Sequence, residues 1–259
     1  MARSTPSVTE ALLANVARHG TLLPADETTL RKLPYRIKAL QPEQDVVRQG
    51  DRPEVAVFVV KGMLARYHTL PDGNRQYVAL HVAGDMPDIH SLFIQEMDHA
   101  VCALDAAEIA LFPHDAVRTA LLKRPALAFA FWRMTLIDAA IFRQAITNNS
   151  ARPPAVRLAH LFCEQVTRAR QLGLITGSCS LPLNQQQLGQ LLGMSHISVN
   201  RALQQLRKLK LAELHRGRLD IGDWSALTQF AGFDPTYLHL TKDSETARTP
   251  FKGRRKADR

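Results

Sequence analysis

Cysteine is scarce in this chain of 259 residues, which contains only Cys102, Cys163 and Cys179. No two of them stand in a CxxC spacing, and an odd number cannot pair completely, so the sequence argues against a disulfide framework. We expect each cysteine to be a packing residue in a protein of the reducing cytoplasm.

Long apolar runs are also absent. Although 46% of the residues are hydrophobic, no run of 18 apolar residues without a charge occurs, so a membrane span is not expected. The first twenty residues lack the uninterrupted apolar core of a signal peptide. The composition therefore predicts a cytoplasmic protein that does not bind a membrane.

Catalytic motifs are missing as well. The chain contains no Ser/His/Asp order, no Walker loop and no GxGxxG sequence. We therefore predict that it is not an enzyme, and we assign no catalytic residue.

The net charge of +9 is concentrated in two stretches. Residues 184–218 contain six basic residues against one acid, a net charge of +5, and residues 241–259 have a net charge of +4. The rest of the chain sums to zero. Because a polyanionic partner would favour such clustering, we expect a nucleic acid to contact these two stretches.

Residues 183–211 have the pattern of a helix-turn-helix. The pattern divides at Gly193, where a three-residue turn needs a positive φ, into helices at Gln185–Leu192 and His196–Lys210. The apolar positions predicted to be buried are Leu188, Leu191 and Leu192 in the first helix and Val199, Leu203, Leu206 and Leu209 in the second.

Each of these helices begins with a capping residue. Asn184 is followed three positions later by Gln187, and Ser195 precedes the second helix. The polar residues on the outer side of the second helix are His196, Asn200, Arg201 and Gln204. In a helix-turn-helix this side enters the major groove of DNA. An ordinary helical hairpin, the alternative, does not require such a group of polar residues on one side.

Residues 211–221, LAELHRGRLDI, predict a strand, a tight turn at Arg216 and Gly217, and a second strand. Such a hairpin after a helix-turn-helix is a wing. Together the two elements resemble the C-terminal domain of the CRP/FNR family, bacterial regulators typified by the cyclic-AMP receptor protein and the fumarate and nitrate reduction regulator. The resemblance continues, in order and spacing, through the preceding 160 residues.

The resemblance implies a transcription regulator that binds a palindromic operator in double-stranded DNA as a homodimer, with RNA polymerase as a further partner. By the same resemblance, the phosphate contacts are Asn184, Gln185, Gln186, Ser195 and Ser198, and the base contacts are His196, Ile197, Asn200 and Arg201. Gln204 and the wing residues His215, Arg216 and Arg218 complete the predicted DNA-binding set. Much of the family has a glutamate at the position of Ile197, so its best-known operator sequences do not carry over.

The pattern from Tyr35 onward changes to that of strands. Short β-branched and aromatic segments lie at 35–40, 44–50, 55–62, 63–70 and 76–84, and PDGN at 71–74 predicts a hairpin turn. This part resembles the β-roll sensor domain of the same family, with VFVVKG at 57–62 and AGD at 83–85 as its landmarks.

Nucleotide-binding members of the family carry a glutamate for the ribose and an arginine for the cyclic phosphate after the second landmark. Neither is found here, and no lysine or arginine occurs between Arg75 and Arg118. The same interval contains seven acids: Asp85, Asp88, Glu96, Asp98, Asp105, Glu108 and Asp115. Since charge-assisted donors bind phosphodiesters, we predict that the effector, which is unknown, is not a cyclic nucleotide.

Three scattered cysteines do not suffice for an iron–sulfur cluster, so no cofactor is predicted. Binding of haem or a metal ion stays an open possibility, because the sequence offers the potential ligands His68, His81, His90, His99 and His114. Surface or hydrogen-bonded core positions are the commoner roles for single histidines, and we assign no metal ligand.

Residues 127–149 predict a helix that is apolar on nearly every side and is therefore buried all round. One face would pack on the β-roll and the other on a second copy. The seam expected for a parallel pair is Ala130, Met134, Ile137, Ile141 and Gln144. The alternative is an ordinary core helix of a monomer. SARPP at 150–154 predicts a hinge.

Helices are further expected within 1–20, at 22–33, with Asp26 in its first turn, and at 155–172. The segment LPL at 181–183 predicts a strand, and Trp224, Leu227 and Phe230 share a core face near the end. The polar, basic segment after Leu240 is expected to be disordered.

The predicted fold class is α+β: an N-terminal antiparallel, cyclic-nucleotide-binding-like β-roll, a long dimerisation helix and a C-terminal winged helix-turn-helix. The domain boundaries are 20–125 for the sensor, 126–149 for the dimerisation helix, 154–240 for the DNA-binding domain and 241–259 for the tail. The alternative function is a sensor whose winged helix binds a protein partner. A third alternative, an enzyme with an appended winged helix, is not supported, because the sequence contains no catalytic constellation.

Overall fold

The computed structural model describes residues 7–173 and 178–240. The chain forms two compact units, and the boundary between them, after Ala139, lies within the long helix α4 (Pro125–Ala151). The tail at 241–259 lies outside the described residues, so its predicted disorder stays a prediction.

Two short helices begin the first unit. Helix α1 spans Val8–Ala17 and α2 spans Pro24–Arg31, with Pro24 in the first turn as expected. The carboxylate of Asp26 accepts a hydrogen bond from the Leu23 N–H (2.9 Å) and forms an ion pair with Arg124 (2.6 Å). The Arg124 hydrogen bond lowers the pKa of this buried carboxyl.

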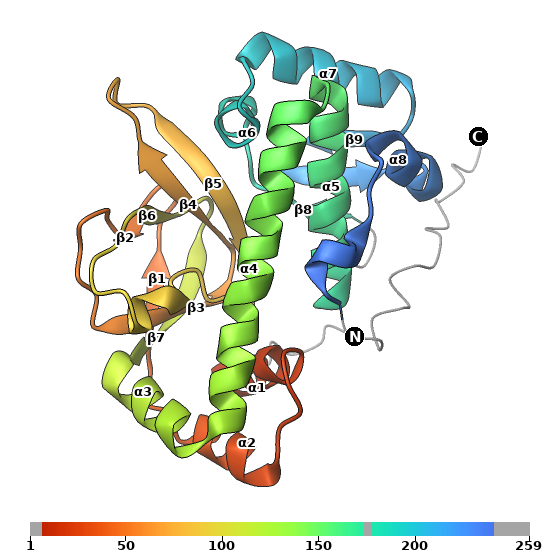
Figure 1. The fold of residues 1–259 in the computed structure, drawn as a ribbon. Coiled ribbons are helices and arrows are strands. Elements are labelled where there is room, and N and C mark those ends of the chain that lie inside the picture. Colours follow the sequence, from red (N-terminus) through yellow and green to blue (C-terminus); the bar gives the residue numbers. More distant parts are fainter. Residues whose placement is uncertain (1–6, 174–177, 241–259) are drawn as a thin grey trace. The chain divides into compact units, whose positions relative to one another are not determined.

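The strands of the first unit form two antiparallel sheets, with the orders β1-β7-β3 and β2-β6-β4-β5 (Figure 1). Their bounds are β1 (Arg36–Leu40), β2 (Asp45–Val47), β3 (Val55–Lys61), β4 (Met63–Thr69), β5 (Arg75–Val82), β6 (Ala100–Ala103) and β7 (Ala107–Pro113). The five predicted strands are present, and the predicted turn joins β4 to β5, with the Leu70 N–H donating to the Asn74 carbonyl (2.8 Å). The predicted antiparallel β-roll is confirmed.

Strands β6 and β7 were not predicted, although β7 is the central strand of its sheet. Its segment, AEIALFP, is apolar without alternation because both of its faces are buried. Ala110 and Phe112 belong to the core shared with the helices, whereas Ile109 and Leu111 belong to the core between the two sheets. Such a run has no period-2 signal from which sequence reasoning could identify a strand.

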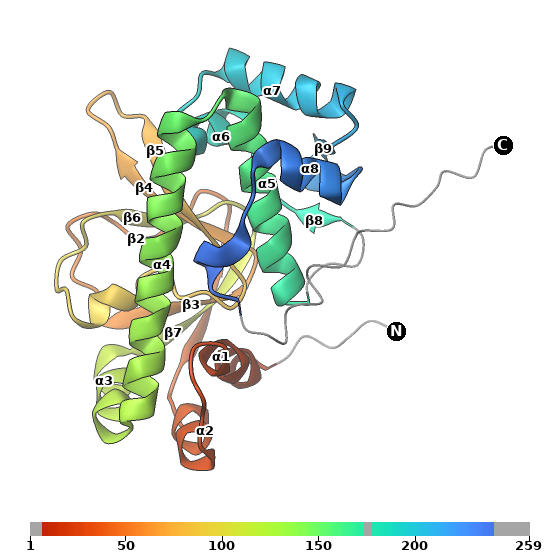
Figure 2. The same ribbon diagram turned by 45° about the vertical axis from the view of Figure 1, so that its right-hand side comes forward.

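A short 3₁₀ turn and two helices complete the first unit. The turn, η1 (Ile89–Leu92), follows β5, and helix α3 (His114–Lys123) follows β7. The first half of α4 packs through Leu127, Ala130 and Phe131 into the core formed by α1, α2, α3 and the sheet β1-β7-β3. Figure 2 shows α1, α2, α3 and this part of α4 gathered beside β3 and β7.

The single chain does not bury α4 all round, and the prediction gave one face of the helix to a second copy. Its exposed apolar side chains are Phe129, Trp132, Leu136 and Ile146, which are 52% to 69% exposed. The predicted seam is wrong at Ala130 and Met134, which lie in the core of the first unit, and Gln144 contacts His160 in the second unit (3.2 Å). A pattern of apolar residues on all sides does not tell which face the chain itself covers.

Helix α4 is the one helix within residues 7–173 and 178–240 that is long and apolar enough to cross a membrane. This is weak evidence for a span, because core and interface helices of soluble proteins have the same composition. Arg133, Asp138 and Arg143 moreover interrupt its apolar surface.

The second unit begins with the last part of α4, and after the expected break at Pro153 it continues into α5 and a three-stranded sheet of order β8-β10-β9. Its further elements are α5 (Pro154–Gln171), β8 (Cys179–Ser180), α6 (Gln185–Leu192), α7 (His196–Lys208), β9 (Ala212–His215), β10 (Arg218–Ile221), α8 (Trp224–Ala231) and η2 (Pro235–Leu238). The strand predicted at 181–183 is therefore misplaced, because the pairing with β10 is made by Cys179 and Ser180.

Helix α5 lies at the centre of the second unit and contacts both α7 and α8. Leu158 and Phe162 are fully buried on it. Of the predicted core face on α8, Leu227 is buried, whereas Trp224 and Phe230 are half-buried, and the Trp224 ring lies 4.2 Å from the guanidinium of Arg170. Helix α5 thereby supports α7, which in turn contacts α6.

Candidate nucleic-acid interface

Helix α6 starts with the predicted capping box. The Asn184 side chain accepts a hydrogen bond from the Gln187 N–H (2.8 Å), and the Gln187 side chain accepts one from the Asn184 N–H (2.9 Å). Two helix-end donors are thereby satisfied within four residues, which explains why the start of α6 was readable from the sequence.

The turn between α6 and α7 requires glycine at two positions. Gly193 ends α6 with φ 61° and ψ 44°, the left-handed conformation that was predicted. Gly189 is needed for a different reason: a Cβ there would lie 2.6 Å from the carbonyl oxygen of Met194. This close approach, which the sequence analysis missed, lets the turn fold back onto α6.

Helix α7 begins at Ser195, whose hydroxyl accepts a hydrogen bond from the Ser198 N–H (3.2 Å). Val199, Ala202 and Leu206 form its buried face. Leu209 was predicted to share that face but is 49% exposed, because α7 ends at Lys208 and the chain turns away through Lys210, whose φ is 55°. Helix α7 is therefore two residues shorter than predicted.

The outer face of α7 presents the predicted base-contacting residues to solvent. His196, Arg201 and Gln204 are exposed, and Ile197 is 64% exposed. Asn200 is half-buried because its side chain donates a long hydrogen bond to the Gln185 side chain of α6 (3.4 Å). None of the thirteen predicted DNA-binding residues is buried.

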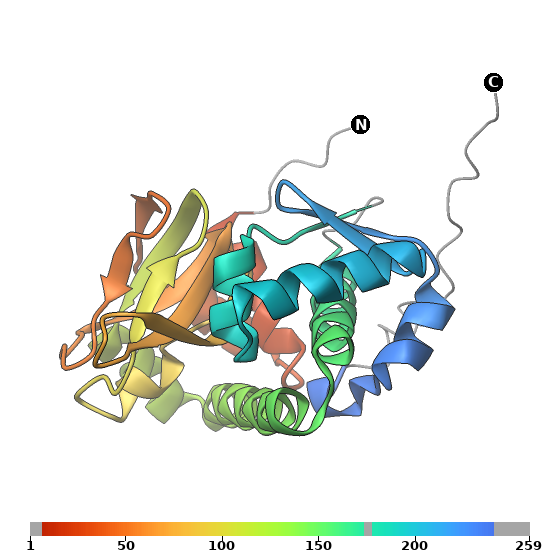
Figure 3. The same ribbon diagram turned by 90° about the horizontal axis from the view of Figure 1, so that it is seen from above.

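Strands β9 and β10 form the predicted wing. Arg216 and Gly217 occupy the turn with φ values of 49° and 74°, which match a tight two-residue hairpin turn. His215, Arg216 and Arg218 are exposed there, but Arg218 forms an ion pair with Asp220 (3.1 Å). Figure 3 shows α7 along its length with the wing strands behind it.

Two side chains that the sequence analysis missed hold α6 in position. Asn149 of α4 donates a hydrogen bond to the Leu191 carbonyl (3.1 Å), and Arg157 of α5 donates one to the Leu192 carbonyl (3.3 Å). Both carbonyls lie at the C-terminal end of α6, where they lack partners within the helix. These contacts span 35 to 42 residues, so no local signal could have revealed them.

The comparison with known protein families follows this division of the chain. Residues 156–230 match the model of the Crp-like helix-turn-helix domain, and residues 37–124 match that of the cyclic nucleotide-binding domain. The chain belongs to the CRP/FNR family. The resemblance that the helix-turn-helix and the β-roll indicated is thereby confirmed.

Relatives and solved structures of the family agree with this assignment. The chain is 21% identical over 212 residues to the fumarate and nitrate reduction regulatory protein of Vibrio cholerae, covering 82% of this chain and 85% of the relative. It is 23% identical over 204 residues to the global nitrogen regulator of Synechococcus elongatus, covering 76% and 90%. The structure of FixK2 from Bradyrhizobium japonicum superposes with a TM-score of 0.70 at 20% identity, covering 76% of this chain and 98% of FixK2.

The sensor domain of this family member has one deeply buried arginine, Arg66 on β4. Its guanidinium donates a hydrogen bond to the Pro87 carbonyl (2.6 Å) and forms an ion pair with Asp138 of α4 (2.6 Å). Arg66 is 3% exposed. Arg66 therefore ties the turn before η1 to α4. It precedes the interval between Arg75 and Arg118, which contains no lysine or arginine.

Three of the acids in that interval have structural roles that the sequence did not show. Asp85, Asp88 and Asp105 accept hydrogen bonds from the N–H groups of Val82 (2.9 Å), Val57 (2.8 Å) and Met63 (2.8 Å), respectively. Burial raises the pKa of Asp88 to about 7. Asp88 therefore has a structural role, which is to accept the hydrogen bond from Val57, and is not placed to bind a ligand.

An open pocket of about 740 Å³ lies beside this interval in the first unit. Its ionisable lining residues are Asp45, Arg48, Glu96 and Asp98, together with Tyr67. Arg48 forms an ion pair with Asp45 (3.5 Å), and Glu96 forms one with Arg52 (2.9 Å). The pocket lining carries more negative than positive charge.

The histidines left open by the sequence are mostly interior. Burial lowers the pKa of His81, His90, His99 and His114, in the case of His90 to about 4. His114 has a hydrogen-bond partner in the Ser91 hydroxyl (3.0 Å). His68 and His90 each face the ring of His99, at centroid distances of 6.5 Å and 5.0 Å.

Proposed function

We propose that the protein regulates transcription as a homodimer that inserts α7 of each copy into successive major grooves of a palindromic operator. The observation that carries this proposal is the outer face of α7, where Arg201, Ile197 and Gln204 are exposed on a helix anchored by its other side. Side chains that reach base edges must project from such a rigid, solvent-facing helix. RNA polymerase and a cytoplasmic location belong to the same proposal, and the three buried free thiols suit a reducing compartment.

The proposed dimer contact is the exposed stripe of α4. Positions 129, 132, 136, 139, 143 and 146 alternate by three and four residues, which is the spacing of a coiled-coil seam. Phe129, Trp132, Leu136 and Ile146 lie on it and are more than half exposed in one chain. This stripe replaces the seam predicted from the sequence, and a second copy in parallel orientation is the occupant that would cover it.

Selection of bound DNA from a random pool tests the proposal. We expect an inverted repeat whose half-sites lie about 34 Å apart, one turn of the double helix. Ile197→Glu should change the preferred base at one position of each half-site, because residue 197 faces the bases in this proposal. Recovery of no motif would contradict DNA recognition, and an unchanged motif with the variant would contradict the assignment of residue 197.

A protein-binding winged helix is the second candidate. It would not need the net charge of +5 that residues 184–218 carry. It would gain support if the random pool gave no motif while the purified protein captured a specific partner through residues of α7.

We further propose that the effector is not cyclic AMP or cyclic GMP. Arg48 lines the pocket, and Arg52 and Arg75 contact residues that line it; Arg48 and Arg75 are paired with Asp45, and Arg52 with Glu96. The buried Arg66 is paired with Asp138. A cyclic phosphate would have to displace these acids or stay unpaired at a high desolvation cost. Calorimetry with either nucleotide at millimolar concentration should show no saturable binding, and micromolar affinity accompanied by tighter operator binding would refute this proposal.

A further inference from the structure

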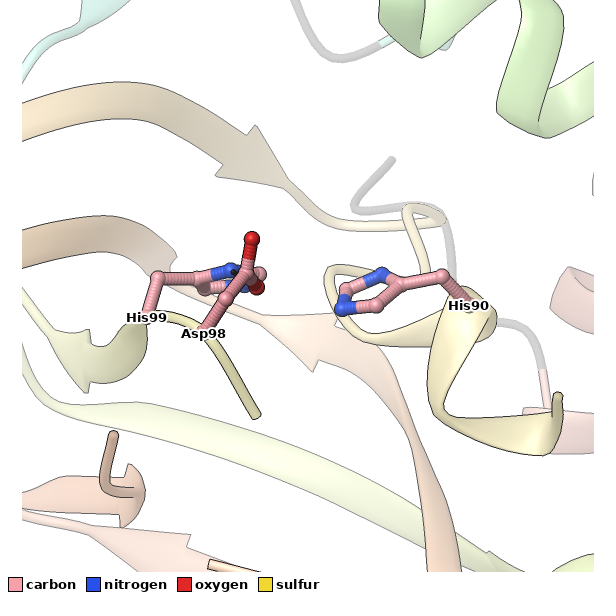
Figure 4. Close-up of side chains that lie close together, drawn as sticks. All are labelled: His90, Asp98 and His99. Atoms are coloured by element: carbon pink, nitrogen blue, oxygen red, sulfur yellow. Dashed lines mark hydrogen bonds and ion pairs between the residues drawn. The ribbon is translucent and has the colours of Figure 1, made fainter. Parts of the chain in front are cut away.

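Two histidines and an aspartate meet in the first unit at a place to which no function is assigned. His90 projects from η1, and Asp98 and His99 directly precede β6. One ligand atom from each residue lies within 4.8 Å of those of the other two. Figure 4 shows the His90 ring pointing toward the Asp98 and His99 pair. We propose that His90 and His99, the latter oriented by Asp98, bind one divalent transition-metal ion.

Unsatisfied ring nitrogens are the second observation that points to a ligand. The Nε2 atoms of His90 and His99 are both buried and have no hydrogen-bond partner within the described residues. A buried polar atom without a partner is costly, so such atoms are rare unless something outside the protein chain satisfies them. Two of them, on rings whose centroids are 5.0 Å apart, fit coordination of one ion.

Asp98 prepares His99 for this role. The Asp98 Oδ1 atom lies 2.7 Å from the His99 Nδ1 atom. A carboxylate oxygen only accepts hydrogen bonds, so the Nδ1 atom carries the proton and the ring keeps a lone pair on Nε2. Carboxylates commonly hold ligand histidines in this way, so Asp98 acts on the ion through the His99 ring.

The donor set selects the kind of metal. Imidazole nitrogens suit Zn²⁺, Co²⁺, Ni²⁺ or Fe²⁺, whereas Mg²⁺ and Ca²⁺ prefer oxygen ligands. In a tetrahedral zinc site the ligand atoms lie about 3.4 Å apart, because each bond is about 2.0 to 2.1 Å long. The ligand atoms of the cluster lie within 4.8 Å of one another, so small side-chain movements bring the two imidazoles to this spacing. Two imidazole ligands leave two coordination positions for water or another molecule.

The charges around the site favour the binding of a cation. Asp98 also lines the open pocket, together with Asp45, Glu96 and Arg48, so the entrance carries excess negative charge. Arg66 is the cation that works against the site, since its charge acts on both His90 and His99. Its ion pair with Asp138 at 2.6 Å offsets much of that charge.

Metal titration of the full-length chain tests this proposal, which does not depend on the proposed DNA-binding function. The protein is prepared without a polyhistidine tag, stripped with a chelator and titrated with Zn²⁺ and Co²⁺ by calorimetry and visible absorption. We expect one ion per chain with micromolar or tighter affinity, an absorption spectrum of nitrogen- and oxygen-ligated Co²⁺, and no binding of Mg²⁺. Absence of saturable Zn²⁺ binding would overturn the proposal.

Three variants locate the site. His90→Gln and Asp98→Asn should each weaken Zn²⁺ binding at least tenfold, and the Asp98 side chain is 80% exposed, so its replacement leaves the core intact. His19→Gln is the matched control, because His19 lies in the same unit and also has a buried, unpartnered ring nitrogen but is outside the cluster. Zn²⁺ should raise the melting temperature of the wild type and of the control, and not that of the other two. Equal Zn²⁺ affinity in all four proteins would overturn the assignment to these residues.

Discussion

The two units of this molecule use the same polar residue types in opposite ways. The first unit keeps His81, His99 and His114 in its interior. The second unit exposes His196 and His215 on α7 and the wing. The arginines divide less sharply: Arg66 of the first unit is buried against Asp138, whereas Arg201 and Arg216 of the second unit form no ion pair with any described residue. Arg207 and Arg218 of the second unit pair with Glu213 and Asp220 at the surface.

This difference separates two kinds of recognition. A buried imidazole or guanidinium interacts with few partners at close range, so the interior of the first unit suits a small ligand. Exposed cations on a rigid helix and a hairpin suit a large, hydrated polyanion such as DNA. Variants of both units test this difference.

Helix α4 belongs to both units, and a charge on its exposed stripe should have the largest effect. Trp132→Asp would place an unpaired charge in the proposed dimer contact, which we expect to cost at least about 3 kcal/mol and to weaken dimerisation more than a hundredfold. Sedimentation should show a dimer of twice 28.9 kDa for the wild type and a monomer for the variant.

Two controls locate the seam. Leu122→Asp, at an 85% exposed position on α3, should leave the dimer intact. Ile141→Asp lies on the face predicted from the sequence, and this half-buried residue should matter less than Trp132. If Ile141→Asp separates the copies and Trp132→Asp does not, the exposed stripe is not the seam.

His160 is the interior histidine of the second unit and so the exception to the comparison. Burial lowers its pKa from 6.5 to about 4, and its ring contacts those of Tyr237 and Phe233. The unfolded chain therefore binds a proton between these pH values while the folded chain does not, so stability is lost as pH falls from 6.5 toward 4. His160→Phe should remove up to about 3 kcal/mol of this loss.

Urea unfolding at pH 7.5 and pH 4.5 measures this effect. In a Trp132→Phe background, Trp224 fluorescence reports on the second unit alone, because the chain has two tryptophans. His239→Phe changes an exposed histidine of the same unit and should leave the pH dependence as it is. A His160→Phe protein that loses as much stability as the wild type at pH 4.5 would show that His160 does not cause the loss.

Arg201→Ala tests whether the exposed cations of α7 read sequence. We expect a loss of about 1 to 3 kcal/mol on the selected operator and little change on random DNA, because a guanidinium that faces bases distinguishes them. Arg216→Ala in the wing is the matched control and should weaken both complexes alike. Equal losses of binding free energy for Arg201→Ala on both DNAs would show that Arg201 contacts phosphates and not bases.

Removal of residues 241–259 should have the smallest effect on recognition. Their net charge of +4 is expected to meet phosphates, so the truncated protein should bind random DNA less tightly and with a shallower salt dependence. The selected motif should stay the same, and a changed motif would mean that this segment contacts bases.

Local features of the fold were determined by the sequence alone. The caps at Asn184 and Ser195, the left-handed Gly193 and the wing turn at Arg216 each depend on residues within four positions of one another. Their hydrogen bonds and dihedral angles follow from residue type and spacing, so the helix-turn-helix and wing were predicted almost to the residue.

Which face of an element is covered was decided by the tertiary structure. The sequence of α4 is apolar on all sides, and only packing shows that Ala130 lies in the core while Trp132 is exposed. Strand β7 was missed for the same reason, since burial on both faces removes the alternation that marks a strand.

The contacts between polar side chains inside the first unit could not be predicted from the sequence either. Arg66 meets Asp138 across 72 positions, and His90 meets Asp98 and His99 only because η1 and the start of β6 fold together. Sequence composition established that cations are missing between Arg75 and Arg118. Which acids and histidines converge there depends on the path of the chain between η1 and β6, because no periodic pattern of residue types encodes how an irregular segment folds.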